Sequence, residues 1–69
     1  MKAGTIGFDD SAITCIVRDL SISGAALDVT SSASIPEHFT LSFRADADGR
    51  HMRCRVVWRN EDRIGVAFD

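Results

Sequence analysis

The chain has 69 residues, of which 45% are hydrophobic and 26% are charged, and its formal net charge is −2. This length allows one domain over residues 1–69 with a single core, and the apolar content excludes a disordered chain. The acidic balance argues against a partner that is a nucleic-acid polymer. No apolar run approaches the roughly 18 residues of a membrane span, and none follows Lys2 as in a secretory signal, so we expect a cytoplasmic protein.

Apolar and polar residues alternate in six short runs along the chain, and no run has the period of a helix. β-branched residues dominate several runs, and turn-forming residues separate them. A single helical turn at 36–38 is compatible with the sequence because Pro36 suits a first helical position. We therefore expect strands at 2–8, 12–18, 25–29, 38–44, 50–59 and 63–68.

The connections between these runs are short, which favours antiparallel pairing. Asp48-Gly49, between the fourth and fifth runs, is a strong hairpin signal. A small six-stranded sheet would expose two edges unless it closed on itself. The sequence thus predicts an all-β fold, a six-stranded antiparallel barrel. The alternation predicts an inward face that includes Cys15, Val17, Leu27, Phe39, Leu41, Cys54, Trp58, Ile64 and Val66.

No group of residues in the sequence has the pattern of a catalytic site. The carboxylate pairs Asp9-Asp10 and Glu61-Asp62 lie in turn segments, where solvated acids are common. His38 and His51 have no nucleophile partner in the sequence. We expect a protein that is not an enzyme.

Cys15 and Cys54 are too few for a disulfide framework. Both lie in alternating apolar runs, so we expect two buried free thiols, with a disulfide between paired strands as the alternative. Neither histidine forms a spaced pair with a cysteine, and structural zinc usually takes four ligands. We expect neither a metal nor a cofactor.

The connection from Arg18 to Gly24 contains the residues best suited to hold a ligand. It joins two predicted strands and therefore lies at a barrel rim. The Asp19 carboxylate can accept paired donors from a guanine edge, and Ser21 offers a hydroxyl and a backbone amide for an anionic oxygen. Gly24 can adopt positive φ and let the backbone approach a ligand. The alternative is an ordinary turn, since Asp, Ser and Gly are common in turns.

Asp19-x-Ser21-x-x-Gly24 resembles the (Asp/Asn)-x-Ser-x-x-Gly motif of PilZ domains. Residues 15–21 and 24–27 around it, and 54–59 followed by 63–68, also resemble PilZ strands, so the similarity extends from about residue 3 to residue 68. It implies a six-stranded antiparallel barrel and a signalling module that binds cyclic di-GMP. The ligand-binding residues that it implies are Asp19, Ser21 and Gly24, and we add the adjacent Arg18.

PilZ receptors also carry an Arg-x-x-x-Arg motif before the first strand, and this sequence has no arginine before Arg18. Lys2 cannot replace the bidentate grip of a guanidinium on a phosphate. Each lost contact is worth roughly 1.5–3 kcal/mol, so we expect weak binding of cyclic di-GMP. Either the chain is a naturally degenerate PilZ protein, or an upstream segment supplies the arginines. The alternative function is an adaptor that does not bind the dinucleotide and acts through a protein partner.

A stripe of arginines forms a second candidate surface. Arg53, Arg55 and Arg59 share the polar face of the fifth predicted strand, with Arg44 and Arg50 nearby. The stripe is either a solvated strand face or a patch for phosphates or an acidic protein partner. A single-stranded nucleic acid is the least favoured ligand, because the chain is acidic and has few aromatic residues for stacking.

Overall fold

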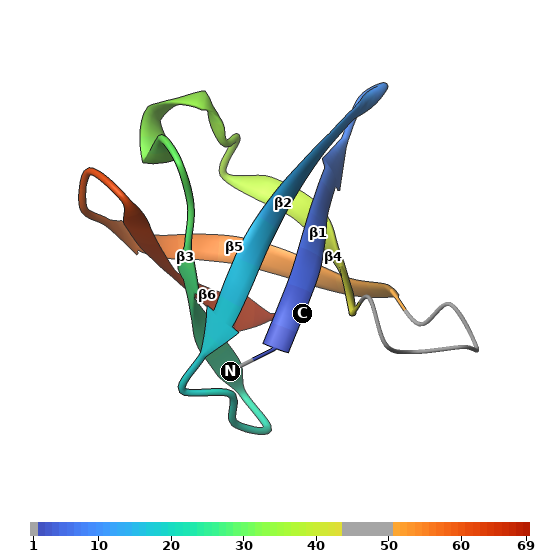
Figure 1. Ribbon diagram of the computed structural model, residues 1–69. Helices are drawn as coiled ribbons and strands as arrows, with labels where there is room; N and C mark the ends of the chain where they lie inside the picture. Colours follow the sequence, from blue (N-terminus) through green and yellow to red (C-terminus); the bar gives the residue numbers. More distant parts are fainter. Residues whose placement is uncertain (1, 44–50) are drawn as a thin grey trace.

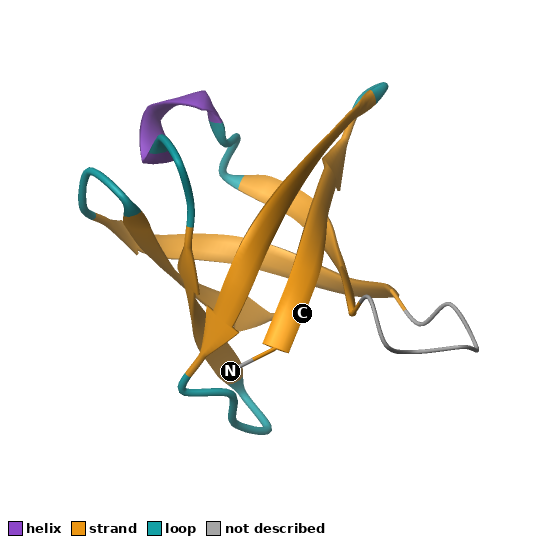
Figure 2. Ribbon diagram, viewed as in Figure 1, coloured by secondary structure: helices purple, strands orange, loops and turns teal. Residues whose placement is uncertain are grey.

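The computed structural model describes residues 2–43 and 51–69, which form a closed barrel of antiparallel strands (Figure 1). The predicted all-β, six-stranded barrel is therefore confirmed. One short 3-10 helix interrupts the strands, and the described residues contain no α-helix (Figure 2). The elements are β1 (Lys2–Phe8), β2 (Ser11–Arg18), β3 (Gly24–Asp28), η1 (Ser32–Ser34), β4 (His38–Phe43), β5 (His51–Arg59) and β6 (Arg63–Phe68).

The strand order is β1-β2-β3-β6-β5-β4, and β4 returns to β1 to close the barrel. Two register pairs define one end of it. Lys2 pairs with Val17, so the start of β1 lies beside the end of β2. Gly24 pairs with Ala67, so the start of β3 lies beside the end of β6. The connection 19–23, which we call the rim loop, therefore lies near the N-terminal end of the chain (Figure 1).

The core contains most of the inward face that the alternation predicts, without Trp58 and with Ile35 added from the connection before β4. Ile6, Leu27, Leu41 and Ile64 are fully buried. Side chains of a strand alternate between the two faces, and β2 and β4 bury alternate residues, whereas β3 and β6 also bury adjacent ones. The buried cluster comprises Ile6, Cys15, Val17, Leu27, Val29, Ile35, Phe39, Leu41, Cys54, Ile64 and Val66.

Both cysteines are buried free thiols, as expected from the sequence. Burial raises the pKa of the Cys15 thiol to about 11. Burial also raises the pKa of Cys54 to about 11, with smaller contributions from Asp69 and Cys15. Both groups therefore behave as small apolar side chains at neutral pH.

The predicted strand limits agree with the observed ones to within one residue wherever the structure describes them. β2 begins one residue earlier than predicted, and β3 lies one residue closer to the N-terminus. Residues 44–50 lie outside the described part of the chain. This segment contains the predicted hairpin signal Asp48-Gly49 and two arginines of the stripe, Arg44 and Arg50.

Trp58 is not a core residue, and that prediction was wrong. Its side chain is 45% exposed. The β5–β6 register shifts between Val56 and Trp58, so Val57 is an extra residue in β5. Such a bulge breaks the alternation, and both Val57 and Trp58 are exposed. The indole lies over Gly65, where a Cβ would stand 2.1 Å from the indole nitrogen.

The suggested helical turn at 36–38 is also wrong, because the turn forms at Ser32–Ser34 instead. The Ser32 N–H donates to the Glu61 carbonyl at 3.0 Å, and the Ser34 hydroxyl donates to the Ser31 carbonyl at 2.9 Å. The Glu37 carbonyl accepts the Val56 N–H at 2.8 Å, which keeps the chain beside β5 before β4 begins.

Candidate functional site

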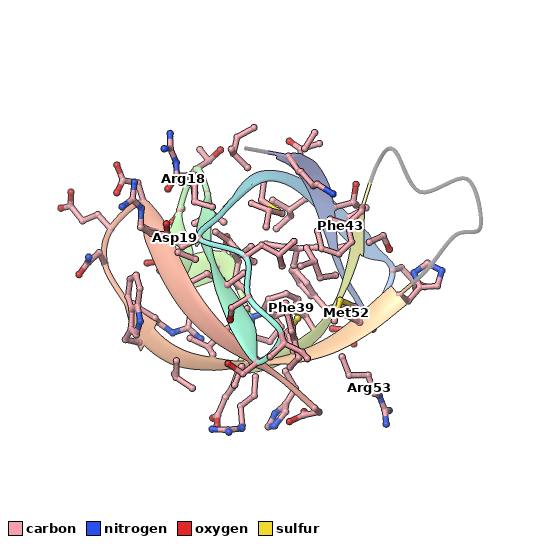
Figure 3. All side chains as sticks on the ribbon, turned by 90° about the horizontal axis from the view of Figure 1, so that it is seen from below. Arg18, Asp19, Phe39, Phe43, Met52 and Arg53 are labelled. Carbon is pink, nitrogen blue, oxygen red and sulfur yellow. The ribbon has the colours of Figure 1, made fainter. Side chains whose placement is uncertain are left out.

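Asp19 begins the rim loop in a left-handed conformation, with φ of 49°. Asp tolerates this region better than most residues, because its short polar side chain can bond locally. The residue is exposed. Within the described residues, its carboxylate has no hydrogen-bond or ion-pair partner. Figure 3 shows Asp19 and Arg18 at the end of β2. The carboxylate is thus available to a ligand at the rim.

Ser21 holds the rim loop together. Its hydroxyl accepts the Gly24 N–H at 3.2 Å and the Ser23 N–H at 3.4 Å, and it donates to the Gly24 carbonyl at 3.1 Å. Its backbone N–H donates to the same carbonyl at 2.8 Å. Both groups that the sequence suggested for an anionic oxygen are therefore used inside the loop. Ser21 fixes the conformation that presents Asp19.

Position 24 requires a glycine because β3 packs closely against β6 there, and not because a turn needs a positive φ. It does not adopt the left-handed region, contrary to the sequence-based reason for a glycine here. A Cβ at this position would stand 2.2 Å from the Val66 carbonyl oxygen. Because real Cβ contacts are never so short, a side chain would force β3 and β6 apart. The close backbone approach at Gly24 is thus to β6.

Arg18 is held by an acid on the neighbouring strand. Its Nε donates to one carboxylate oxygen of Asp28, and Arg63 Nε donates to the other at 2.6 Å. These hydrogen bonds, with that of Arg63 the larger, lower the pKa of Asp28. Asp28 raises the pKa of Arg63, with smaller contributions from the charges of Asp62 and Asp19. The three side chains join β2, β3 and β6 at the end of β3 that lies away from the rim loop.

Sequence reasoning missed Asp28 and Arg63. The available signal was the single acid in the predicted third strand, flanked in sequence by apolar residues. An isolated charge on a strand is commonly opposite a counter-charge on its neighbour. Its partners depend on strand order, because β6 lies next to β3 only when the barrel closes.

Lys2 does not substitute for an arginine at the rim loop. Its ammonium lies over the ring of Phe43, 5.8 Å from the ring centre. Phe43 belongs to β4, and Figure 3 shows it away from Asp19. This cation–π contact holds the Lys2 charge on the β4 side of β1.

The arginine stripe divides into two parts in the structure. Arg53 and Arg55 are exposed on β5, and Arg53 extends outward in Figure 3. Arg59 instead donates from Nη1 to the Ser32 carbonyl, so it supports the turn before β4. Across residues 2–43 and 51–69, no group of three or more His, Cys, Asp or Glu side chains is placed to hold a metal ion. No helix there is long and apolar enough to cross a membrane.

The structure is a small all-β domain, a closed barrel whose second and third strands are joined by the rim loop. Compared with protein families, the chain matches the PilZ domain over residues 3–69, and it belongs to that family. No curated protein and no solved structure matches the chain.

Proposed function

We propose that this PilZ domain is a non-catalytic cytoplasmic module that binds cyclic di-GMP at the rim loop and passes the signal to a protein partner. The observation that carries the proposal is the Asp19 carboxylate. It lies in the segment that resembles the PilZ motif, inside the matched residues 3–69, and it is exposed and has no partner within the described residues. A carboxylate accepts two hydrogen bonds side by side, which matches the adjacent N–H donors of a guanine edge.

The other motif residues support this contact in different ways. Ser21 fixes the rim loop through its hydroxyl, and Gly24 lets β3 pack against β6. Arg18 uses Nε to bind Asp28, which leaves its terminal amino groups to face a phosphate. Asp19 is therefore the specific contact, Arg18 is a charge contact, and Ser21 and Gly24 are positioning residues.

Residues 1–69 by themselves bind the dinucleotide weakly. The sequence has no arginine before Arg18, and Lys2 is held over Phe43. Two missing charge-assisted contacts, at roughly 1.5–3 kcal/mol each, weaken binding by about two to four powers of ten.

Calorimetric titration with cyclic di-GMP tests the proposal. We expect measurable heat with the unchanged chain and its loss with Asp19→Ala. The matched control is Asp9→Ala, because Asp9 is also exposed and has φ of 50° in the β1–β2 turn. Both variants carry the same cost of alanine in the left-handed region. Equal affinities for the two variants would refute the role of Asp19.

A second experiment restores the missing arginines. Lys2 pairs with Val17, so residues joined ahead of Lys2 run toward Arg18 and the rim loop. A short N-terminal extension containing Arg-x-x-x-Arg is expected to strengthen binding about a hundredfold or more. The control extension carries Gln in both positions. If the two extensions give the same affinity, arginines ahead of β1 do not contact the phosphates of a dinucleotide bound at the rim loop.

The alternative function is an adaptor that does not bind the dinucleotide. Two apolar side chains of the rim loop favour it, since Ile22 is 100% exposed and Leu20 is 47% exposed. Exposed apolar residues close together are typical of protein contacts. The adaptor function is supported if the arginine extension also fails to bind cyclic di-GMP while the barrel remains folded.

A further inference from the structure

One edge of β2 carries no neighbouring strand over most of its length. β2 pairs with β1 from Ser11 to Val17. On its other side it pairs with β3 only at Ile16, Val17 and Arg18. Backbone hydrogen bonds of loops and turns in the described residues involve none of residues 11–15. In an antiparallel strand every second residue directs its N–H and C=O away from a given neighbour. Ser11–Cys15 therefore presents unpaired backbone groups, and we call this stretch the open edge.

The open edge lacks the features that usually protect a strand from pairing. Natural edges carry lysines, prolines or bulges, or are covered by another segment. Residues 11–17 contain no charged residue, no proline and no glycine. The β1–β2 register runs without a shift. The edge is thus regular, uncharged and rich in β-branched residues, which is the composition that accepts another strand.

The barrel also leaves room beside this edge. β2 and β3 diverge beyond the pair Ile16–Asp28, as Figure 1 shows. A hollow of about 540 Å³ lies there, with Thr14 and Cys15 on one wall and Val29 and Thr30 on the other. Val29 is turned toward β6, since its N–H donates to the Asp62 carbonyl at 2.9 Å. The segment after β3 therefore does not cover the open edge.

A carboxylate without an ion-pair partner in the described residues lies at each end of the open edge. Asp9 and Asp10 form the exposed turn just before Ser11. At the other end, Asp28 and Asp62 line the hollow with Arg63. Arg63 and Arg18 are both bonded to Asp28. The two guanidinium groups therefore balance the charge at this end, but both are bonded to Asp28, and the Asp62 carboxylate has no ion-pair partner within residues 2–43 and 51–69.

We propose that the open edge of β2 binds an extended segment of a partner protein as an added β-strand. The segment is uncharged in its middle, where it pairs with the backbone of Ser11–Cys15. It carries Lys or Arg at its ends, where Asp10 and Asp62 lie. Backbone hydrogen bonds supply the affinity in this mode of recognition, and the flanking charges supply the selection. A second copy of this chain is disfavoured, because residues 9–17, which it would present, contain no lysine or arginine to meet Asp10 and Asp62.

The probe is the peptide Lys-Val-Thr-Val-Thr-Val-Lys, added to the isotope-labelled full chain and followed by NMR. We expect amide shifts and slower hydrogen exchange at residues 11–15. A peptide with Glu at both ends is expected to bind about tenfold more weakly, because its charges repel the acidic ends of the site. The peptide with N-methyl groups on alternate residues, which removes the pairing donors from one edge, is expected not to bind.

Protein variants separate the charge contribution from the backbone contribution. Asp10→Asn and Asp62→Asn are each expected to weaken binding of the Lys-ended peptide by about two- to fivefold. Glu37→Gln is the control, because Glu37 lies beside β5 on the opposite side of the strand order. Equal binding of the N-methylated peptide, or shifts confined to other strands, would overturn the proposal. It would also be overturned if the chain without peptide showed protected residues 11–15 and concentration-dependent sedimentation, which would make a second copy the occupant.

Discussion

A side chain at position 24 would collide with the backbone of the barrel itself. The Cβ of alanine would stand 2.2 Å from the Val66 carbonyl oxygen, and neither backbone can rotate away as a side chain can. We expect Gly24→Ala to lower the free energy of unfolding by about 1–3 kcal/mol in urea titrations. Gly7→Ala is the control, because its Cβ would meet the Thr40 carbonyl at an ordinary 3.8 Å. Gly7→Ala is expected to leave the free energy of unfolding unchanged or to raise it by about 0.4–1 kcal/mol. Similar decreases in the free energy of unfolding of the two variants would contradict the close packing of β3 on β6.

At the scale of single residues, the sequence identified the motif but not the part that each member takes. Asp, Ser and Gly at this spacing predicted a rim loop, and the loop lies there. The internal bonds of Ser21 and the contact of Gly24 with Val66 depend on how β3 meets β6. That meeting joins residues far apart in the chain, so no local pattern reveals it. For the same reason the pairing of Arg63 with Asp28 was missed.

At the scale of elements, Asp28 ties three strands together through Arg18 and Arg63. Its lowered pKa means that the folded chain keeps this carboxylate ionised to lower pH than the unfolded chain does. The stabilisation is therefore fully present above the ordinary aspartate pKa of about 3.9 and is lost as pH falls toward the lowered value. We expect the unfolding free energies of the unchanged chain and Asp28→Asn to differ at pH 6 and to converge as the pH falls through the lowered pKa of Asp28. A difference that stays constant with pH would show that Asp28 does not act through its charge.

The strands themselves were predictable because each has a regular alternation over a buried face. β4 is the clearest case, with Phe39 and Leu41 buried and polar residues between them. The exception is the end of β5, where the bulge at Val57 turns Trp58 outward over Gly65. The apolar run Val56-Val57-Trp58 breaks the alternation in the sequence, but it does not show which residue is the extra one, so the position of the bulge has no local signal. It follows from the fit of β5 onto β6.

At the scale of the whole molecule, a small core bears the stability of the barrel. A chain of this length is expected to have a free energy of unfolding of about 3–10 kcal/mol. Leu41 is fully buried, and Leu41→Ala is expected to cost about 2–5 kcal/mol through lost burial and the cavity that remains. The control is Val57→Ala, because Val57 is 51% exposed. Val57→Ala is expected to lower the free energy of unfolding much less than Leu41→Ala does. Equal decreases in the two variants would contradict the assignment of the core.

The closed barrel also explains why the candidate site lies where it does. Closure gives every strand a neighbour on each side for at least part of its length, and the loops that join the strands lie at the rims. The rim loop joins two strands at the end where β1 begins and where the Phe68 N–H donates to the Ser23 carbonyl at 2.9 Å. A ligand at this rim therefore touches the loop and stands beside the start of β1 and the end of β6.

The most direct test of the proposed function is an NMR titration of the labelled chain with cyclic di-GMP at concentrations up to the millimolar range. We predict shifts centred on the amides of residues 18–24, with smaller ones at the neighbouring ends of β1 and β6. The same titration with Asp19→Ala is predicted to leave these amides unmoved, whereas Asp9→Ala retains the shifts. No change at the rim loop at saturating dinucleotide, or the same shifts in both variants, would contradict the account.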